Sequence, residues 1–240
     1  MEEWLTEEQR EIQRMQLLLL REIYSISAAP VFKGGTALEM AYGLDRFSED
    51  LDFDADINDM AIFDEAISNL DSEFNAIEND WESDVVRHSN MHIFTLYFRA
   101  LHSNSRLAIK VDAVLDKPVI APKRKMLNIY GKPVAVSVMD EIEILAEKVN
   151  AIMNPKRGQP RDLYDLRFLL EKRVPVDFHL IYLKSNSTVF GNVPRYSLKG
   201  FEKRIDSLGK KWGELKPYLR EVPDFAETKK YVLGVFKLLG

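Results

Sequence analysis

One stripe of hydrophobic residues predicts a long helix near the start of the chain, from Thr6 to about Tyr24. Residues Thr6 to Gln9 match a capping box, a pattern with which many helices begin. Behind it, four apolar residues recur at helical spacing: Ile12, Met15, Leu19 and Ile23.

Residues 50–54 alternate acidic and apolar side chains, as a half-buried strand does. Leu51 and Phe53 are expected to face a core, while the aspartates between them face outward or into a cleft. A short strand and two helices are expected around this strand, over residues 30–32, 36–42 and about 58–70.

Two later stretches, residues 90–100 and 106–115, also alternate and predict an antiparallel hairpin joined by residues 102–105. In its second strand, Lys110 and Asp112 share the face opposite four apolar residues, which are Leu107, Ile109, Val111 and Ala113.

The pattern changes near Met139. Before it, residues 128–134 suggest a further hairpin with a strand over 134–138. After it, apolar residues recur at helical spacing and predict helices over about 140–152, 161–172, 177–183, 197–218 and 224–239. We therefore expect an α/β (α+β) fold, with a mixed sheet flanked by helices in residues 1–138 and a helical C-terminal domain in residues 139–240.

Composition is that of an ordinary globular protein, with 46% hydrophobic and 30% charged residues. The chain has no cysteine, which excludes disulfides and thiolate-bound zinc or iron–sulfur sites. Its four histidines show no metal-ligand spacing, so any metal is expected to be a hard cation bound by oxygen. The net charge of −5 argues against general coating of nucleic acid but leaves room for a local basic surface.

We expect a cytoplasmic protein without membrane contact. The leucine run at residues 17–20 is far shorter than the span of about 20 residues that a membrane helix needs. Glutamates near the N-terminus exclude a secretory signal.

The strongest functional signal is a glycine pair, Gly34 and Gly35, before the helix that begins near Thr36. Backbone N–H groups there can approach a phosphate, which the helix dipole also favours. A glycine pair alone is most often a turn. However, the strand that follows returns the chain to the edge where the glycine pair lies. Asp50 and Asp52 project from one side of that strand and can share metal ions. A phosphate cradle beside a metal clamp predicts a site for a nucleoside triphosphate.

The acids of this segment are also compatible with two other arrangements. A solvated face is the simpler one, although bound cations would better relieve the repulsion among residues that are poor strand formers. The second is a calcium loop formed by Asp54, Asp56, Asn58 and Glu65, in which Asp59 replaces the glycine that the turn requires.

Asp112 is a third candidate acid, because a carboxylate within an apolar strand is costly unless it is paired. A structural salt bridge would satisfy it. It would equally complete a triad with Asp50 and Asp52 that suits two divalent ions.

Together these residues resemble the nucleotidyltransferase toxin family typified by the AbiEii and AbiGii abortive-infection proteins, within the DNA polymerase beta superfamily. The resemblance covers about residues 33–170. It rests on five segments: Gly34–Leu38, Arg46–Phe53, Lys110–Asp112, Lys148 and Arg161–Leu166.

The resemblance implies an enzyme that uses a nucleoside triphosphate and Mg²⁺ or Mn²⁺. Proteins of this family resemble toxins that are encoded beside an antitoxin. Several of them transfer nucleotides onto the ends of transfer RNA. The acceptor is therefore expected to be RNA, such as transfer RNA, or a protein. Two alternatives stay open: a non-catalytic module of the same fold that binds nucleotide or an antitoxin, and a phosphotransferase.

The site residues follow from the motifs and the resemblance together. The expected metal ligands are Asp50, Asp52 and Asp112, which with Lys148 and Asp162 form the expected catalytic set. The expected nucleotide-binding residues are Lys33, Gly34, Gly35, Thr36, Arg46, Ser48, Lys148 and Asp165.

Some of these residues would also be ordinary in a structural role. Lys148 fits a surface lysine on an amphipathic helix, and Asp162 fits a first-turn acid that stabilises its own helix. Lys156, Arg157 and Arg161 form a basic rim that an RNA backbone would fit, although a solvated loop accounts for it as well.

Overall fold

The computed structural model describes residues 4–75, 82–100, 105–186 and 193–239. By their internal contacts the residues form two compact units. The first contains Met1–Gly43 and Phe47–Met139, and the second contains Leu44–Arg46 and Asp140–Gly240.

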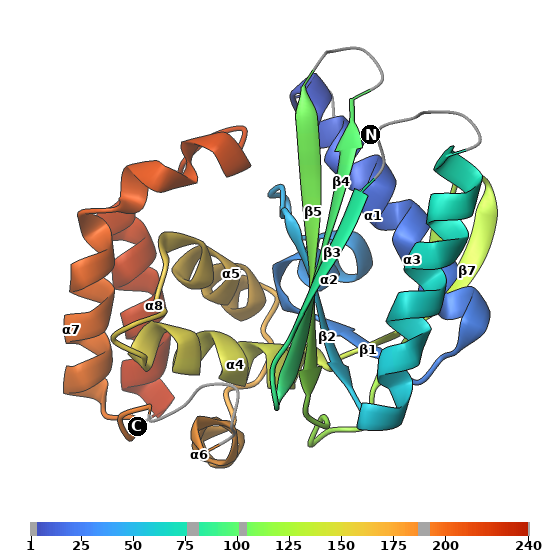
Figure 1. Cartoon of the computed structure of the whole chain (residues 1–240). Coiled ribbons are helices and arrows are strands. Elements are labelled where there is room, and N and C mark those ends of the chain that lie inside the picture. The colour runs from blue at the N-terminus through green and yellow to red at the C-terminus, as the bar shows by residue number, and fades with distance from the viewer. Residues whose placement is uncertain (1–3, 76–81, 101–104, 187–192, 240) are drawn as a thin grey trace. The chain divides into compact units, whose positions relative to one another are not determined.

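A seven-stranded mixed sheet forms the centre of the first unit (Figure 1). Its strand order is β3-β4-β5-β2-β1-β7-β6, in which β2 pairs parallel with β5 and β1 parallel with β7. The strands are β1 Val31–Lys33, β2 Asp50–Ala55, β3 Glu82–Arg87, β4 Met91–Arg99, β5 Arg106–Leu115, β6 Lys123–Ile129 and β7 Lys132–Val138. The expected α/β fold with a mixed sheet is confirmed.

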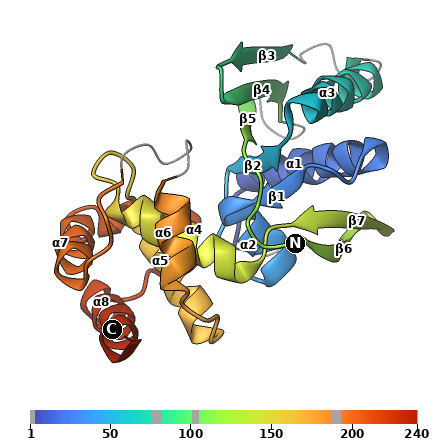
Figure 2. The same cartoon turned by 90° about the horizontal axis from the view of Figure 1, so that it is seen from below.

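Helices and an aromatic core stabilise this sheet. Helix α1 (Glu7–Ile26) packs beside α3 (Met60–Asn75), and Figure 2 shows the two helices next to each other. The ring of Phe63 on α3 stacks on Phe94 of β4 and meets Phe53 of β2 edge to face, with ring centroids 5.7 and 5.2 Å away. The buried face of β2 therefore carries Phe53, and the acidic residues of that strand project from the opposite face.

The second unit is helical. Helix α4 packs against α5, α6 and α7, and an aromatic cluster of Phe178, Tyr196, Phe201 and Phe236 fills part of its core. The elements are α4 Glu141–Met153, α5 Pro160–Glu171, α6 Phe178–Ser185, α7 Leu198–Gly209, the 3-10 helix η2 Trp212–Tyr218, and α8 Phe225–Leu239.

Three local expectations differ from the structure. Strand β3 has no counterpart in the sequence pattern, because all but one of its side chains are exposed and no alternation marks it. The helix expected over 197–218 is two elements, α7 and η2, with Pro217 inside the second. The expected hairpin is present as β6 and β7, but its second strand begins at Lys132 rather than at Val134. Of the loop expected over 102–105, residues 102–104 lie outside the described part.

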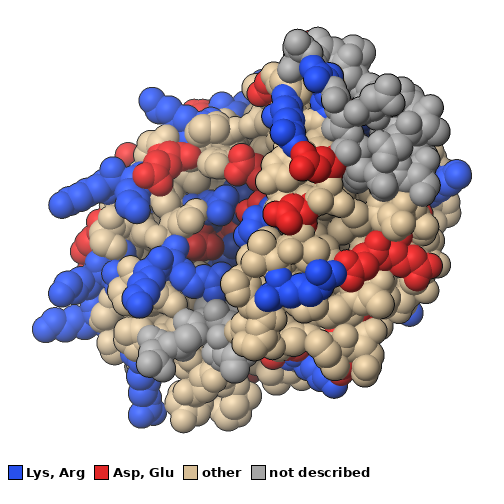
Figure 3. All heavy atoms as spheres, viewed as in Figure 1, with Lys and Arg blue, Asp and Glu red and all other residues tan. Residues whose placement is uncertain are grey.

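The two units differ sharply in charge. The first contains 13 Lys and Arg and 23 Asp and Glu, a net −10, whereas the second contains 20 and 15, a net +5. Figure 3 shows lysine and arginine side chains standing out over the region of α7, at the left of the view. No helix in the described ranges is both long and apolar enough to cross a membrane.

Candidate active site

The glycine bend and the Asp52 carboxylate lie against each other. Gly34, the first residue of α2 (Gly34–Tyr42), has a φ of +76°, which favours glycine. A Cβ atom at this position would collide with a carboxylate oxygen of Asp52 and lie 3.0 Å from its Cγ. Only glycine therefore lets the carboxylate pack against the start of the helix.

Strand register places the third acid directly beside this contact. Asp52 of β2 is the register partner of Asp112 of β5, and Asp50 is the partner of Lys110. Because register partners on neighbouring parallel strands project from the same face, Asp50, Asp52 and Asp112 share one face of the sheet.

Two lysines balance part of this acidic face. Lys33 Nζ lies 2.5 Å from Asp54 Oδ1, and both side chains are buried. Lys110 Nζ donates to Asp112 Oδ2 at 2.7 Å. The expectation that Asp54 faces outward or into a cleft is therefore wrong, because the ammonium of Lys33 neutralises it in the interior. The binding role expected for Lys33 stays a prediction.

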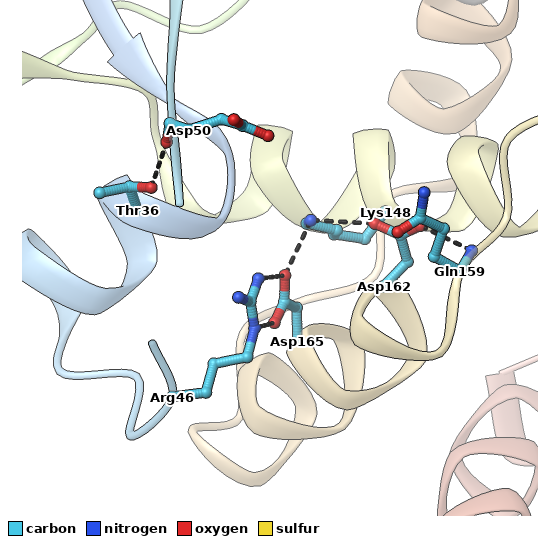
Figure 4. Close-up of polar contacts among 7 residues, drawn as sticks. All are labelled: Thr36, Arg46, Asp50, Lys148, Gln159, Asp162 and Asp165. Atoms are coloured by element: carbon cyan, nitrogen blue, oxygen red, sulfur yellow. Dashed lines mark hydrogen bonds and ion pairs between the residues drawn. The ribbon is translucent and has the colours of Figure 1, made fainter. Parts of the chain in front are cut away.

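The start of β2 is fixed by hydrogen bonds to its backbone. The Thr36 hydroxyl donates to the carbonyl of Asp50 (Figure 4). From α1, the buried Gln16 amide donates to the carbonyls of Ser48 and Glu49, at 3.0 and 2.8 Å. Two side-chain donors, one from α1 and one from α2, thus fix the segment that presents Asp50.

Sequence reasoning missed Gln16. A signal existed, since a glutamine on the buried side of an amphipathic helix needs a polar partner inside the protein. Its two partners are backbone carbonyls more than 30 residues away, so no local pattern identifies them. For Ser48, the structure records that its carbonyl accepts one of these bonds, and its own expected binding role stays a prediction.

The acidic face suits a divalent cation chemically. Carboxylate oxygens are the ligands that Mg²⁺ and Mn²⁺ prefer. Asp112 Oδ1 is buried and has no hydrogen-bond partner within the described residues, as expected of an atom that awaits a ligand. Within the same residues, no three acidic or histidine side chains are gathered into a preformed metal cluster. Asp50, Asp52 and Asp112 therefore remain predicted ligands.

The calcium-loop alternative loses two of its ligands. Asp54 is buried on Lys33, and Asp56 caps a 3-10 helix, η1 (Ile57–Asp59), while it pairs with Lys117 at 2.8 Å. These partners compete directly with a cation at those carboxylates.

A second charged cluster lies in the helical unit (Figure 4). Lys148 of α4 contacts Asp162 at 3.0 Å and Asp165 at 2.8 Å, both on α5. Arg46 binds Asp165 with two hydrogen bonds of 2.6 and 2.8 Å. Asp162 Oδ2 also accepts the backbone N–H of Gln159 and so caps its own helix. Lys148, Asp162, Asp165 and Arg46 are thus brought together, as two cations and two carboxylates.

Burial and charge act in opposite directions on this cluster. Burial alone would raise the pKa of Asp165, but Arg46 and Lys148 outweigh it and lower that pKa to about 2. Burial alone would lower the pKa of Lys148, but the carboxylates of Asp165 and Asp162 outweigh it and raise that pKa. Asp165 and Lys148 are therefore both charged near neutral pH. The nucleotide-binding roles expected of Arg46 and Asp165 stay predictions beside this structural pairing.

Comparison with known proteins gives one family and several similar folds. The sequence matches the family model described as nucleotidyl transferase AbiEii toxin, type IV TA system, over residues 19–223. No curated protein matched.

Two solved structures illustrate the likeness of fold. JHP933 from Helicobacter pylori is 22% identical with a TM-score of 0.65, over 98% of this chain and 92% of that chain. The nucleotidyltransferase toxin MenT4 from Mycobacterium tuberculosis H37Rv is 20% identical with a TM-score of 0.65, over 97% and 84%. At such identities the similarity concerns the fold alone.

We predict that Gly34→Ala destabilises the protein by about 2 kcal/mol, measured by urea unfolding. The left-handed backbone accounts for part of this loss, and displacement of Asp52 for the rest. Gly43→Ala is the matched control, because Gly43 has a φ of +80° but open space around its Cα. Equal losses in the two variants would show that the contact with Asp52 contributes nothing.

The second prediction concerns pH. Because the pKa of Asp165 is lowered from 3.8 to about 2 on folding, its stabilisation is present above about pH 4 and is lost as pH falls towards 2. Asp165→Asn should lower the free energy of unfolding by about 3 kcal/mol at neutral pH. This difference should shrink by about 2 kcal/mol as the pH falls to 2.

Fluorescence of Trp212, a buried residue of the same unit, reports this unfolding. Asp206→Asn is the control, since Asp206 is also ion-paired but exposed, and its effect should be small at every pH. A difference for Asp165→Asn that does not change with pH would contradict the assigned charge.

Proposed function

We propose that this chain, which belongs to the AbiEii family of nucleotidyl transferase toxins of type IV toxin–antitoxin systems, transfers a nucleotide from a nucleoside triphosphate to an acceptor. One observation carries the proposal: Asp52 lies opposite Asp112 in the sheet and packs against the glycine bend at Gly34. Family membership supports nucleotide transfer, and this contact supports the place where it occurs.

In the proposed reaction the bend binds phosphate. The backbone N–H groups near Gly35 and Thr36 donate to phosphate oxygens at the start of α2, where the helix dipole favours negative charge. Gly34 keeps this approach open because it has no side chain. The tie between Thr36 and Asp50 keeps the phosphate site and the acidic strand at a fixed distance.

Asp50, Asp52 and Asp112 would hold Mg²⁺ or Mn²⁺. When bound, such an ion neutralises phosphate charge and polarises the reacting phosphorus centre. Asp112 has a second role in the proposal, in which its carboxylate accepts the proton of the attacking hydroxyl. Lys110, bound to Asp112 Oδ2, keeps the carboxylate oriented.

The transfer itself is an in-line displacement. The acceptor oxygen forms a bond to the α-phosphorus, the bond from that phosphorus to the oxygen that bridges to the β-phosphate breaks, and pyrophosphate leaves. By the resemblance to the family, Lys148 would contact the triphosphate and supply positive charge. Its partner Asp162 is the more exposed of its two carboxylates, so phosphate would replace Asp162 before Asp165.

The biological setting follows from the family. A type IV system pairs a toxin with an antitoxin, so we propose a cognate antitoxin and an RNA acceptor in the cytoplasm. MenT4, which shares the fold, is itself named a nucleotidyltransferase toxin.

Asp50→Asn and Asp52→Asn should each lower transfer of a labelled nucleotide by at least about 100-fold, because the cation loses a charged ligand. The assay incubates the protein with total RNA and each labelled triphosphate. Asp56→Asn, an acid of the same segment that pairs with Lys117, should keep wild-type activity. Full activity in Asp52→Asn would refute the proposal, and triphosphate binding without pyrophosphate release would favour a binding module.

Gln16→Leu should lower kcat by about tenfold with little change in KM, since a loosened loop misplaces Asp50 rather than the substrate. Gln13→Leu is the control from the same helix, because Gln13 bonds Glu39 instead. If both variants lose activity equally, or if KM alone rises, Gln16 does not position the acid.

A further inference from the structure

We propose that the helical unit binds a single ribonucleotide of an RNA acceptor in the cavity between α5 and η2, an inference that rests on the proposed transfer to RNA. The cavity has a volume of about 350 Å³. It is lined by Gln159, Pro160, Arg161, Glu214, Leu215, Pro217 and Tyr218.

The lining has the chemistry that nucleotide recognition uses. The Arg161 guanidinium lies over the Tyr218 ring, 5.9 Å from its centroid, and both groups offer planes on which a base stacks. The prolines and Leu215 supply apolar surface for the edges of a base. The amide of Gln159 and the carboxylate of Glu214 can bond the base and the ribose hydroxyls.

Arg161 differs from two arginines on and beside α5 that are held in ion pairs. Arg46 is bound to Asp165, and Arg167 is bound to Glu171 and Thr228. Among the residues that the structure describes, Arg161 forms no ion pair, and its recorded partner is the Tyr218 ring. Glu214 also lines the cavity, but it is not paired with Arg161, so the guanidinium is available for a phosphate or for stacking.

The position of the cavity links it to the charged cluster. Arg161 directly precedes Asp162, which holds Lys148, and Gln159 donates its backbone N–H to the same Asp162. The first turn of α5 therefore presents the Lys148 cluster and the cavity lining together. A nucleotide held by Arg161 lies next to the group proposed to bind phosphate.

A larger cavity of about 520 Å³ in the same unit is less suited to this ligand. Its lining includes three acids, Asp45, Glu171 and Glu221, and its Arg167 is already paired. These carboxylates would repel a nucleotide phosphate.

The surroundings of the smaller cavity favour a polyanion. The unit carries a net +5, and Lys156 before α5 and Lys216 within η2 are exposed. Positive charge attracts the RNA backbone without regard to sequence, whereas stacking fixes one nucleotide in place. These features favour an RNA acceptor over a polypeptide.

Binding of a short fluorescent single-stranded RNA to the full chain, followed by anisotropy without turnover, tests the proposal. Arg161→Ala and Tyr218→Ala should each weaken RNA binding about tenfold, while Tyr218→Phe keeps the stacking ring and wild-type affinity. Arg195→Ala is the matched control, because Arg195 lies over the Tyr182 ring at 5.7 Å but outside the cavity. Thermal unfolding of each variant verifies that it folds.

Two further arms identify the ligand. A DNA strand of the same sequence should bind more weakly than the RNA, and Glu214→Ala should reduce this preference. Affinity for the nucleoside triphosphate, measured by calorimetry, should be the same in Arg161→Ala and in the wild type.

Three outcomes would overturn the proposal: no RNA binding by the wild type, equal losses in Arg195→Ala and Arg161→Ala, or a loss confined to triphosphate binding. Because RNA binding is measured without chemistry, the cavity is tested separately from the transferase activity. If the wild-type protein shows no transferase activity but binds RNA, and Arg161→Ala binds RNA more weakly, the proposed function is contradicted and the RNA site in the cavity is supported.

Discussion

The carboxylate of Asp52 packs against the backbone of Gly34, and the proposed chemistry of the first unit depends on this contact. It puts negative charge against a bend suited to bind phosphate, which is also negative. Lys33 and Lys110 balance two of the four acids on this face, through Asp54 and Asp112. A triphosphate would add further negative charge, which a bound cation would balance in the proposed reaction.

The helical unit handles charge in the opposite way. Its cluster of Arg46, Lys148, Asp162 and Asp165 contains equal numbers of cations and carboxylates, so it is stable without a ligand. Burying such charges costs free energy that only close pairing recovers. Removing one partner leaves a buried charge unpaired and therefore destabilises the fold. If a phosphate replaced one carboxylate partner of Lys148, replacing Asp162 would disturb this balance least. Asp165 is fully buried and also binds Arg46.

Sequence reasoning predicted features that depend on local pattern. The alternation of polar and apolar residues predicted which face of β2 and of β5 each side chain occupies. The strand register confirms that Asp112 lies on the same face as Asp52. Interactions between distant segments could not be predicted in this way. The bond from Arg46 to Asp165 joins residues 119 positions apart, and nothing near either residue indicates its partner. Strand β3 escaped notice because edge strands exposed on both faces lack a periodic apolar signal.

The net charge of the chain conceals a difference between its two units that bears on the proposed RNA acceptor. An average of −5 argues against binding RNA, yet it combines a unit of −10 with a unit of +5. For the proposed RNA acceptor, long-range electrostatic attraction would come from the positively charged helical unit rather than from the acidic first unit. In the basic unit Arg46 is paired with Asp165, whereas Arg161, in the proposed RNA site, forms no ion pair among the described residues. Total charge says little about nucleic-acid binding when the charges that count lie beside a cavity of nucleotide size.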